Sequence, residues 1–116
     1  MLLRVNKKDL VAASSRPLVL SLLAGGESYG YEIIRKIREV SGGDIDWNEG
    51  MLYPVLHRLE RDKLVVSNWK EADSGRERKY YRLTPLGRKA LAAEKTEWLG
   101  VHQTLEKLWK ATPASI

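Results

Sequence analysis

The fold is decided by residues 64–83, LVVSNWKEADSGRERKYYRL. Both ends of this stretch contain the β-branched and aromatic side chains that favour strands. Between them lies a polar turn, residues 71–77, with Gly75 near its tip, as tight turns prefer. The pattern therefore predicts a β-hairpin whose return strand, residues 78–83, is basic.

The positive charge of the chain is concentrated around this hairpin. The chain has 20 Lys and Arg against 15 Asp and Glu, a net charge of +5. Residues 61–89 hold nine basic and four acidic residues, whereas residues 1–60 and 90–116 are each neutral. A basic excess confined to one segment is typical of a surface that binds nucleic acid or an acidic membrane. The alternative is a basic face that is simply solvated.

Two helical segments are predicted at the start of the chain. Residues 7–24 form either two short helices or one helix kinked at Pro17, because proline lacks the N–H that a helix interior needs. Gly25 and the next glycine end this segment. A second helix is predicted over 29–40, where isoleucines recur at helical spacing. Ser28 is expected to cap it.

A third helix is predicted over residues 49–62. Asp46 stands three residues before Glu49, which is an Asp-led variant of the capping box. Pro54 is tolerable only within the first turn or so of the helix. The apolar stripe is formed by Leu52, Val55, Leu56 and Leu59.

The last helix is predicted to begin with Thr84 as N-cap and Pro85 at the first helical position, and to run to about Lys110. Apolar residues then recur with alternating spacings of three and four, which is typical of a packing seam between helices. Glu94 interrupts this seam. The expected dimer interface is Leu91, Trp98, Val101, Leu105, Leu108 and Trp109.

The order of three helices, a basic hairpin and a long helix is that of a winged helix-turn-helix, a mainly α fold with a small β-hairpin (α+β). Residues 1–83 are expected to form the DNA-binding domain. Residues 84–116 are expected to form a C-terminal dimerisation helix packed with the N-terminal helix. In this fold the third helix enters the DNA major groove and the wing supplies cations to the backbone.

Several function classes are excluded by composition. The chain has no cysteine and two histidines, and no apolar stretch long enough to span a membrane. His57 has no second ligand spaced with it, so no metal is expected, and no cofactor either. No catalytic motif is evident, so the chain is not expected to be an enzyme. We expect a cytoplasmic protein. The rival function is a winged-helix adaptor that binds proteins without specific DNA binding.

Three stretches carry a resemblance to a known family. Residues 29–33 (YGYEI), 49–60 (EGMLYPVLHRLE) and 78–87 (RKYYRLTPLG) resemble signatures of the PadR-like transcriptional regulators. The resemblance covers about residues 7–109 and is to the small subfamily with a single C-terminal helix. It implies a winged-helix repressor that is a homodimer through its first and last helices and binds a palindromic operator in double-stranded DNA. It also implies release by small aromatic or drug-like effectors in some members.

Two residues depart from the family pattern. Met51 stands where the family usually has Ser or Thr, and a thioether is a poor hydrogen-bonding partner for a phosphate or a base. Met51 would instead contact a thymine methyl group, or base preference would differ. Lys63 stands where glycine commonly ends the third helix, and a left-handed conformation there would be costly for lysine.

Candidate DNA contacts come from the start of the second helix, the third helix and the wing. Alternation puts Arg78 and Lys79 on opposite faces of the return strand, so we expect only one of them to reach the backbone together with Arg76. Tyr53 either bonds a phosphate or packs in the core, and Glu49 either caps the helix or accepts from cytosine. The full set is Ser28, Tyr29, Glu49, Met51, Tyr53, His57, Arg58, Arg61, Arg76, Arg78 and Lys79.

The four tryptophans are assigned different roles. Trp98 lies at the middle of the seam, and in a dimer its ring either holds a flat aromatic effector or simply fills the interface. Trp109 is expected to pack in the dimer. Trp47 and Trp69 are expected to pack in the core or at a hinge.

Overall fold

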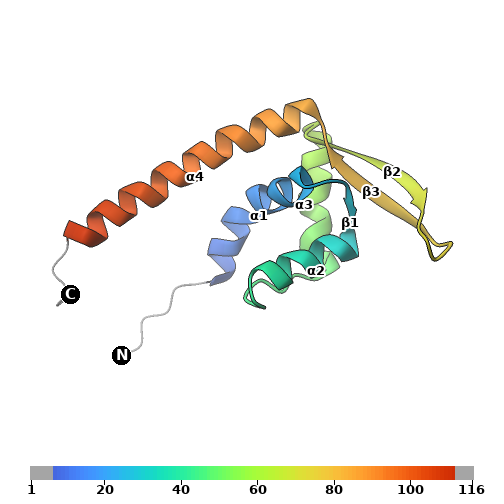
Figure 1. Ribbon diagram of the computed structural model, residues 1–116, viewed down its shortest axis with the longest axis horizontal. Coiled ribbons are helices and arrows are strands. Elements are labelled where there is room, and N and C mark those ends of the chain that lie inside the picture. The colour runs from blue at the N-terminus through green and yellow to red at the C-terminus, as the bar shows by residue number, and fades with distance from the viewer. Residues whose placement is uncertain (1–6, 112–116) are drawn as a thin grey trace.

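The computed structural model describes residues 7–111. The first six residues of the expected DNA-binding domain (1–6) and the last five of the expected dimerisation segment (112–116) lie outside the described residues. The described residues form four helices and a small three-stranded antiparallel sheet at one side of them, which confirms the mainly α winged-helix class (Figure 1). The elements are α1 (Lys7–Ala24), β1 (Ser28–Tyr29), α2 (Gly30–Val40), α3 (Glu49–Arg61), β2 (Val65–Glu71), β3 (Glu77–Leu83) and α4 (Pro85–Ala111).

The β2–β3 hairpin and the far end of α4 project to opposite sides of the three-helix core (Figure 1). Of the two arrangements left open for the first segment, the structure has one helix, α1, with Pro17 inside it. Its second half supplies Val19, Leu20 and Leu23 to the core. The hairpin lies where the sequence predicts it, and its turn contains Gly75 at φ 83°, a left-handed conformation that glycine adopts at no cost.

Strand β1 was not predicted. Ser28 and Tyr29 pair with Tyr81 and Tyr80, so the sheet has the order β1-β3-β2. Because Ser28 is in this strand, the expectation that it caps α2 is wrong: Tyr29 is the N-cap residue and makes no side-chain capping bond. The wing is thereby joined through β1 to the start of α2.

Of the N-caps predicted for α3 and α4, the first is wrong and the second is confirmed. Helix α3 is capped by Asn48, whose side chain accepts from the Met51 N–H at 3.0 Å. The capping box led by Asp46 is therefore wrong, because the helix begins after Asn48 and Asp46 instead pairs with Arg38. The Thr84 cap is confirmed, since its hydroxyl oxygen accepts from the Gly87 N–H at 3.0 Å.

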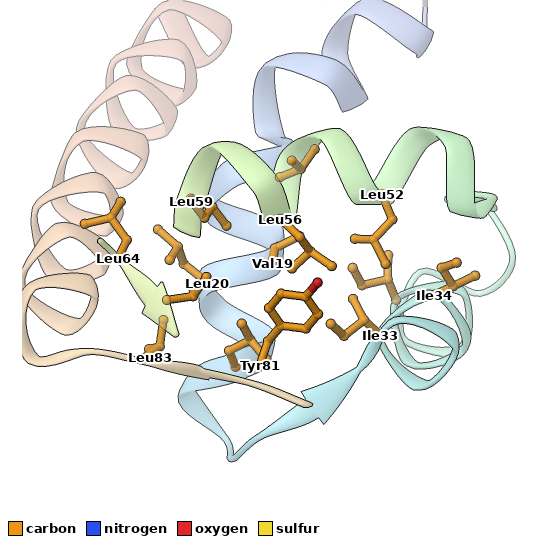
Figure 2. Packing of buried hydrophobic residues seen from close by; sticks show 14 of the residues in the cluster. Val19, Leu20, Ile33, Ile34, Leu52, Leu56, Leu59, Leu64, Tyr81 and Leu83 are labelled. Atoms are coloured by element: carbon orange, nitrogen blue, oxygen red, sulfur yellow. The ribbon is translucent and has the colours of Figure 1, made fainter. Parts of the chain in front are cut away.

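One hydrophobic core unites all three helices of the domain with the sheet (Figure 2). Leu20 of α1, Ile33 of α2 and Leu56 of α3 are fully buried, and Tyr81 of β3 closes the core from the sheet. The predicted stripe of α3 is entirely buried. This packing fixes which side of α3 faces outward.

The junction between α3 and β2 anchors α4. Lys63 has φ 63°, the left-handed conformation that the sequence analysis gave as costly for lysine at this position. The Leu64 N–H donates to the Leu59 carbonyl at 2.9 Å, which completes a Schellman-type helix end. Thr84 donates to the Lys63 carbonyl at 2.7 Å, and a Cβ at Gly87 would overlap the carbonyl oxygen of Leu64. Helix α4 therefore starts in direct backbone contact with this junction.

Candidate nucleic-acid interface

The outward face of α3 carries the side chains expected to read DNA. His57, Arg58 and Arg61 are exposed, and Met51 is 45% exposed. Glu49 is exposed at the first position of the helix, where the N-terminal helix dipole favours a carboxylate. The N-cap bond itself is made by Asn48. The outer surface of α3 thus combines cations, an imidazole and a thioether.

The structure divides these residues between two flanks of α3. Met51 and Arg58 face α1, where they help to line a cavity of about 530 Å³ together with Val11 and Trp47. Tyr53 and His57 lie on the other flank, with ring centroids 6.2 Å apart. The sequence-predicted contacts on this helix are therefore not one continuous row.

Tyr53 joins this flank to the start of α2. Its ring is half-buried and packs against the core, as one of its two expected roles requires. A Cβ at Gly30 would lie 2.6 Å from the Tyr53 hydroxyl oxygen, so the close approach of the two helices depends on glycine at position 30. The hydroxyl therefore lies beside the N-terminus of α2.

The start of α2 presents backbone rather than the Ser28 hydroxyl. Ser28 is 1% exposed, and its hydroxyl donates to Glu32 Oε1 at 2.6 Å. This hydrogen bond, helped by Lys36 and Arg35, holds the pKa of Glu32 below its usual value. Ser28 is therefore a structural residue, and the first N–H groups of α2 are what an anion would meet there.

The hairpin β2–β3, called the wing from here on, carries its cations on different faces. Arg78 lies over the Tyr29 ring, 4.2 Å from its centroid, and Tyr29 in turn packs edge-on against Tyr80 at 5.3 Å. Lys79 points to the opposite face, with Nζ 5.6 Å from the Tyr81 centroid. The alternation expected from the sequence is confirmed.

The tip of the wing is open to solvent. Arg76 is exposed, and among the residues that the structure describes no carboxylate forms an ion pair with it. The turn is closed by backbone bonds, from the Ala72 N–H to the Arg76 carbonyl and from the Gly75 N–H to the Ala72 carbonyl, both 2.8 Å. Nearer the base, Lys70 is held by an ion pair with Glu27. Arg76 is thus an exposed cation at the tip of the wing that is available to a partner.

Trp69 is the residue that sequence reasoning missed. Its expected place in the core or at a hinge is wrong, because it is 66% exposed on β2. Trp47 is 5% exposed and does pack in the core. Trp69 pairs with Lys79 across the hairpin. Strand alternation puts it on the same face as the buried Tyr81, so its exposure comes from its place further toward the tip, beyond the part of the sheet that the core covers.

Most of the expected dimer seam on α4 is uncovered. Leu91 is half-buried and packs against the core of its own chain. The others are exposed, at 45% for Trp98, 56% for Val101, 39% for Leu105, 59% for Leu108 and 62% for Trp109. A second cavity, of about 390 Å³, lies between α1 and α4 and is lined by Pro17, Leu18, Leu91 and Trp98.

Glu94 has a partner that the seam pattern did not suggest. It forms an ion pair with Arg16 of α1, and Arg16 also lies 3.8 Å from the carboxylate of Asp62 at the end of α3. Through Arg16, the Glu94 carboxylate that interrupts the seam therefore links α4 to α1 and lies near Asp62, the C-cap residue of α3.

The described residues offer neither a metal site nor a membrane-spanning helix. In residues 7–111 no group of three or more His, Cys, Asp or Glu is arranged to hold a metal ion. No helix in this part of the chain has the length and apolar character needed to cross a bilayer.

A helix-turn-helix followed by a projecting basic wing defines a winged-helix protein of the kind that regulates transcription. The chain belongs to the PadR-like family of transcriptional regulators, which matches residues 19–93. This is a family of regulators and not of enzymes.

Relatives agree over most of the chain. A transcriptional regulator of Mycobacterium tuberculosis is 38% identical over 88 residues, which are 76% of this chain and 78% of that protein. The structure of a PadR-like transcriptional regulator from Bacillus cereus superposes with a TM-score of 0.81 at 29% identity, covering 90% of this chain and 99% of that one. A transcriptional regulator from Clostridium thermocellum gives a TM-score of 0.77 at 33% identity, covering 85% and 96%.

Proposed function

We propose that this regulator is a homodimeric repressor that binds a palindromic DNA operator. Helix α3 enters the major groove, and the wing lies along the flanking backbone. The observation that carries the proposal is the placing of exposed cations: Arg58 and Arg61 on α3, and Arg76 on a wing tip that projects from the same domain. Phosphate contacts supply affinity, and the α3 side chains supply sequence preference.

The dimer is supported by the uncovered face of α4. A long apolar stripe that leaves Trp98, Leu105 and Trp109 in water is typical of a surface buried in an assembly. A two-fold axis through this stripe would present two copies of α3 to related half-sites. Acting on DNA, the protein would work in the cytoplasm.

The effector part of the proposal rests on the cavity beside Trp98. Its lining is mostly apolar, and its volume of about 390 Å³ is in the range of small-molecule sites. A flat aromatic ligand seated there would touch α1 and α4 at once. We expect Trp fluorescence quenching by planar aromatic compounds to disappear in Trp98→Ala; persistent quenching would place the ligand elsewhere.

The DNA-binding proposal is tested first by selecting bound duplexes from a random pool. An enriched palindrome would support both specific binding and two-fold symmetry. A pool that enriches no sequence, with binding that is weak and insensitive to salt, would favour the protein-interaction adaptor instead.

Variants then separate the roles of individual cations. We expect Arg76→Ala and Lys79→Ala to weaken binding to every sequence and each to reduce the slope of log K against log salt by about one. Arg58→Ala should change which sequences are selected. The matched control is Lys107→Ala on the far half of α4, which should leave the slope unchanged. Electrophoretic titrations in which all of these variants behave like the wild type would refute the interface.

A further inference from the structure

Trp69 stands on the face of the wing that turns toward α3. Side chains two residues apart on a strand share a face, so Trp69 lies on the same side of β2 as Ser67, which donates a hydrogen bond to Glu60 of α3. Their cross-strand partners, Lys79 and Tyr81, lie on this face too. We call these four residues the inner face of the wing.

The inner face passes from buried to exposed along the hairpin. Tyr81, at its base, is 1% exposed and belongs to the core. Lys79 is half-buried, and Trp69 is 66% exposed. A side chain as large as tryptophan leaves a large apolar area in water, and covering that area would be favourable. No element among residues 7–111 covers it.

The surroundings of Trp69 favour a polyanion over an apolar protein surface. Its cross-strand neighbour is Lys79, and its neighbours along the strand, Asn68 and Lys70, are exposed and polar. On the same face Trp69 lies between charged side chains, with Lys79 across the hairpin and the Glu71–Glu77 pair beyond it, so it does not form the contiguous apolar patch that protein partners prefer. The wing also carries the free cation Arg76 at its tip.

The same face adjoins the reading helix. Glu60 and Tyr53 both lie near Tyr81: burial raises the pKa of Tyr81 to about 12, and these two residues add to that rise. The flank of α3 that bears Tyr53 and His57 therefore lies beside the base of the inner face. DNA held by this flank would run past Trp69.

We propose that Trp69 is a DNA-contacting residue of the wing, which lays its indole against the deoxyribose and phosphate beside the groove occupied by α3. The inference deepens the proposed DNA-binding function and rests on it. The ring would cover sugar carbons, and the indole N–H would donate to a phosphate oxygen. Because tryptophan is neutral, this contact adds affinity without releasing a counterion.

The test compares three substitutions on the two strands of the wing. Trp69→Ala and Lys79→Ala remove paired residues of the inner face, and Asn68→Ala alters the neighbouring position on the outer face as the matched control. Each protein is titrated over a range of salt with the duplex enriched by selection and with a mixed-sequence duplex of the same length. Thermal unfolding of each variant checks that the fold is intact.

We expect Trp69→Ala to bind both duplexes about tenfold more weakly at every salt concentration, with an unchanged salt slope. Lys79→Ala should lower the slope, and Asn68→Ala should match the wild type. Quenching of tryptophan fluorescence by DNA should be strong in the wild type and largely absent in Trp69→Phe, which retains a ring for binding.

Trp69→Ala that binds like the wild type, with quenching preserved in Trp69→Phe, would overturn the inference and leave the proposed function standing. A wild-type protein that binds neither duplex would overturn both. A Trp69→Ala defect confined to the selected duplex would also contradict the inference, because a backbone contact acts on every sequence.

Discussion

The two halves of the molecule treat their apolar side chains in opposite ways. In the winged-helix domain, residues such as Leu20, Leu52 and Leu56 have no exposure at all. In α4 beyond Glu94, every large apolar side chain is at least 39% exposed, from Trp98 to Trp109. The domain thus buries its apolar side chains within one copy, whereas the distal half of α4 leaves an apolar face exposed, which the proposed dimer would cover.

The two halves also differ in the interactions that stabilise them. The domain is stabilised by burial in a common core. The distal half of α4 has local interactions such as the pair between His102 and Glu106, whose atoms lie 3.0 Å apart, and such pairs add only a few tenths of a kcal/mol. A helix without tertiary packing is marginal in water, so its stability would depend on the partner copy.

The strongest way to break the domain half is Leu56→Ala. Leu56 is fully buried between the other two helices and the sheet. Removing it should lower the free energy of unfolding by about 3 kcal/mol, through lost burial and the cavity left behind. Denaturant unfolding followed by circular dichroism measures this, and a loss below about 1 kcal/mol would mean that the core is not packed as described.

The matching change in the other half is Leu105→Asp. It places a charge in the proposed seam of both copies, so we expect the dimer to dissociate at least tenfold more readily. The winged-helix domain itself should keep its stability, because Leu105 lies outside its core. Sedimentation at several concentrations is the measurement, and an unchanged monomer fraction would exclude this face as the interface.

A smaller effect on stability is expected at the junction between α3 and β2, where α4 is anchored. Lys63→Gly relieves the left-handed conformation at φ 63° and should raise the free energy of unfolding by about 1 kcal/mol. The control is Asp62→Gly, since Asp62 has an ordinary φ of −81°; this variant gains backbone freedom in the unfolded chain and loses the contacts of its carboxylate with Arg16 and Arg61, so it should be less stable than the wild type. Lys63→Gly that is less stable than the wild type would contradict the strained geometry.

The smallest effect at neutral pH is expected for Tyr81→Phe. Among the described residues no hydrogen-bond partner satisfies the buried Tyr81 hydroxyl, so its removal should change stability by less than about 1 kcal/mol, toward greater stability.

The wild type and Tyr81→Phe should differ in how their stability depends on alkaline pH. Burial, with Glu60 and Tyr53, raises the pKa of Tyr81 to about 12 from an ordinary value of 10.0. The neutral phenol is the form favoured by folding, so its contribution is complete below pH 10 and is lost as pH rises toward 12. Tyr81→Phe should lack this component of alkaline destabilisation, and identical pH profiles would argue against it.

Much of the fold could be predicted because its signals are local. The stripe of α3, the turn around Gly75 and the Thr84-Pro85 start of α4 each depend on neighbours in sequence. Strand β1 could not be predicted, since two residues carry no periodicity and their pairing partners lie some 50 residues away. Ser28 was misassigned for the same reason, because its hydroxyl is claimed by Glu32 once β1 forms.

The candidate site was harder to predict than the fold. Helical spacing indicated which residues of α3 face outward, but not that Met51 and Arg58 turn toward α1 while Tyr53 and His57 turn toward the wing. Glu94 was read as a flaw because its partner, Arg16, is on another helix. Such assignments depend on how the elements pack, which no local pattern contains.

Gly87 sets a dimension of the proposed complex. Glycine at this position lets the backbone of α4 lie directly against the carbonyl of Leu64, and this close contact helps to set the angle between α3 and α4. Two such angles would decide how far apart the paired reading helices stand, and successive major grooves on one side of DNA repeat about every 34 Å. A side chain at position 87 would push α4 away from Leu64, so in the proposed dimer the absence of a Cβ at Gly87 would help to set the distance between the two half-sites.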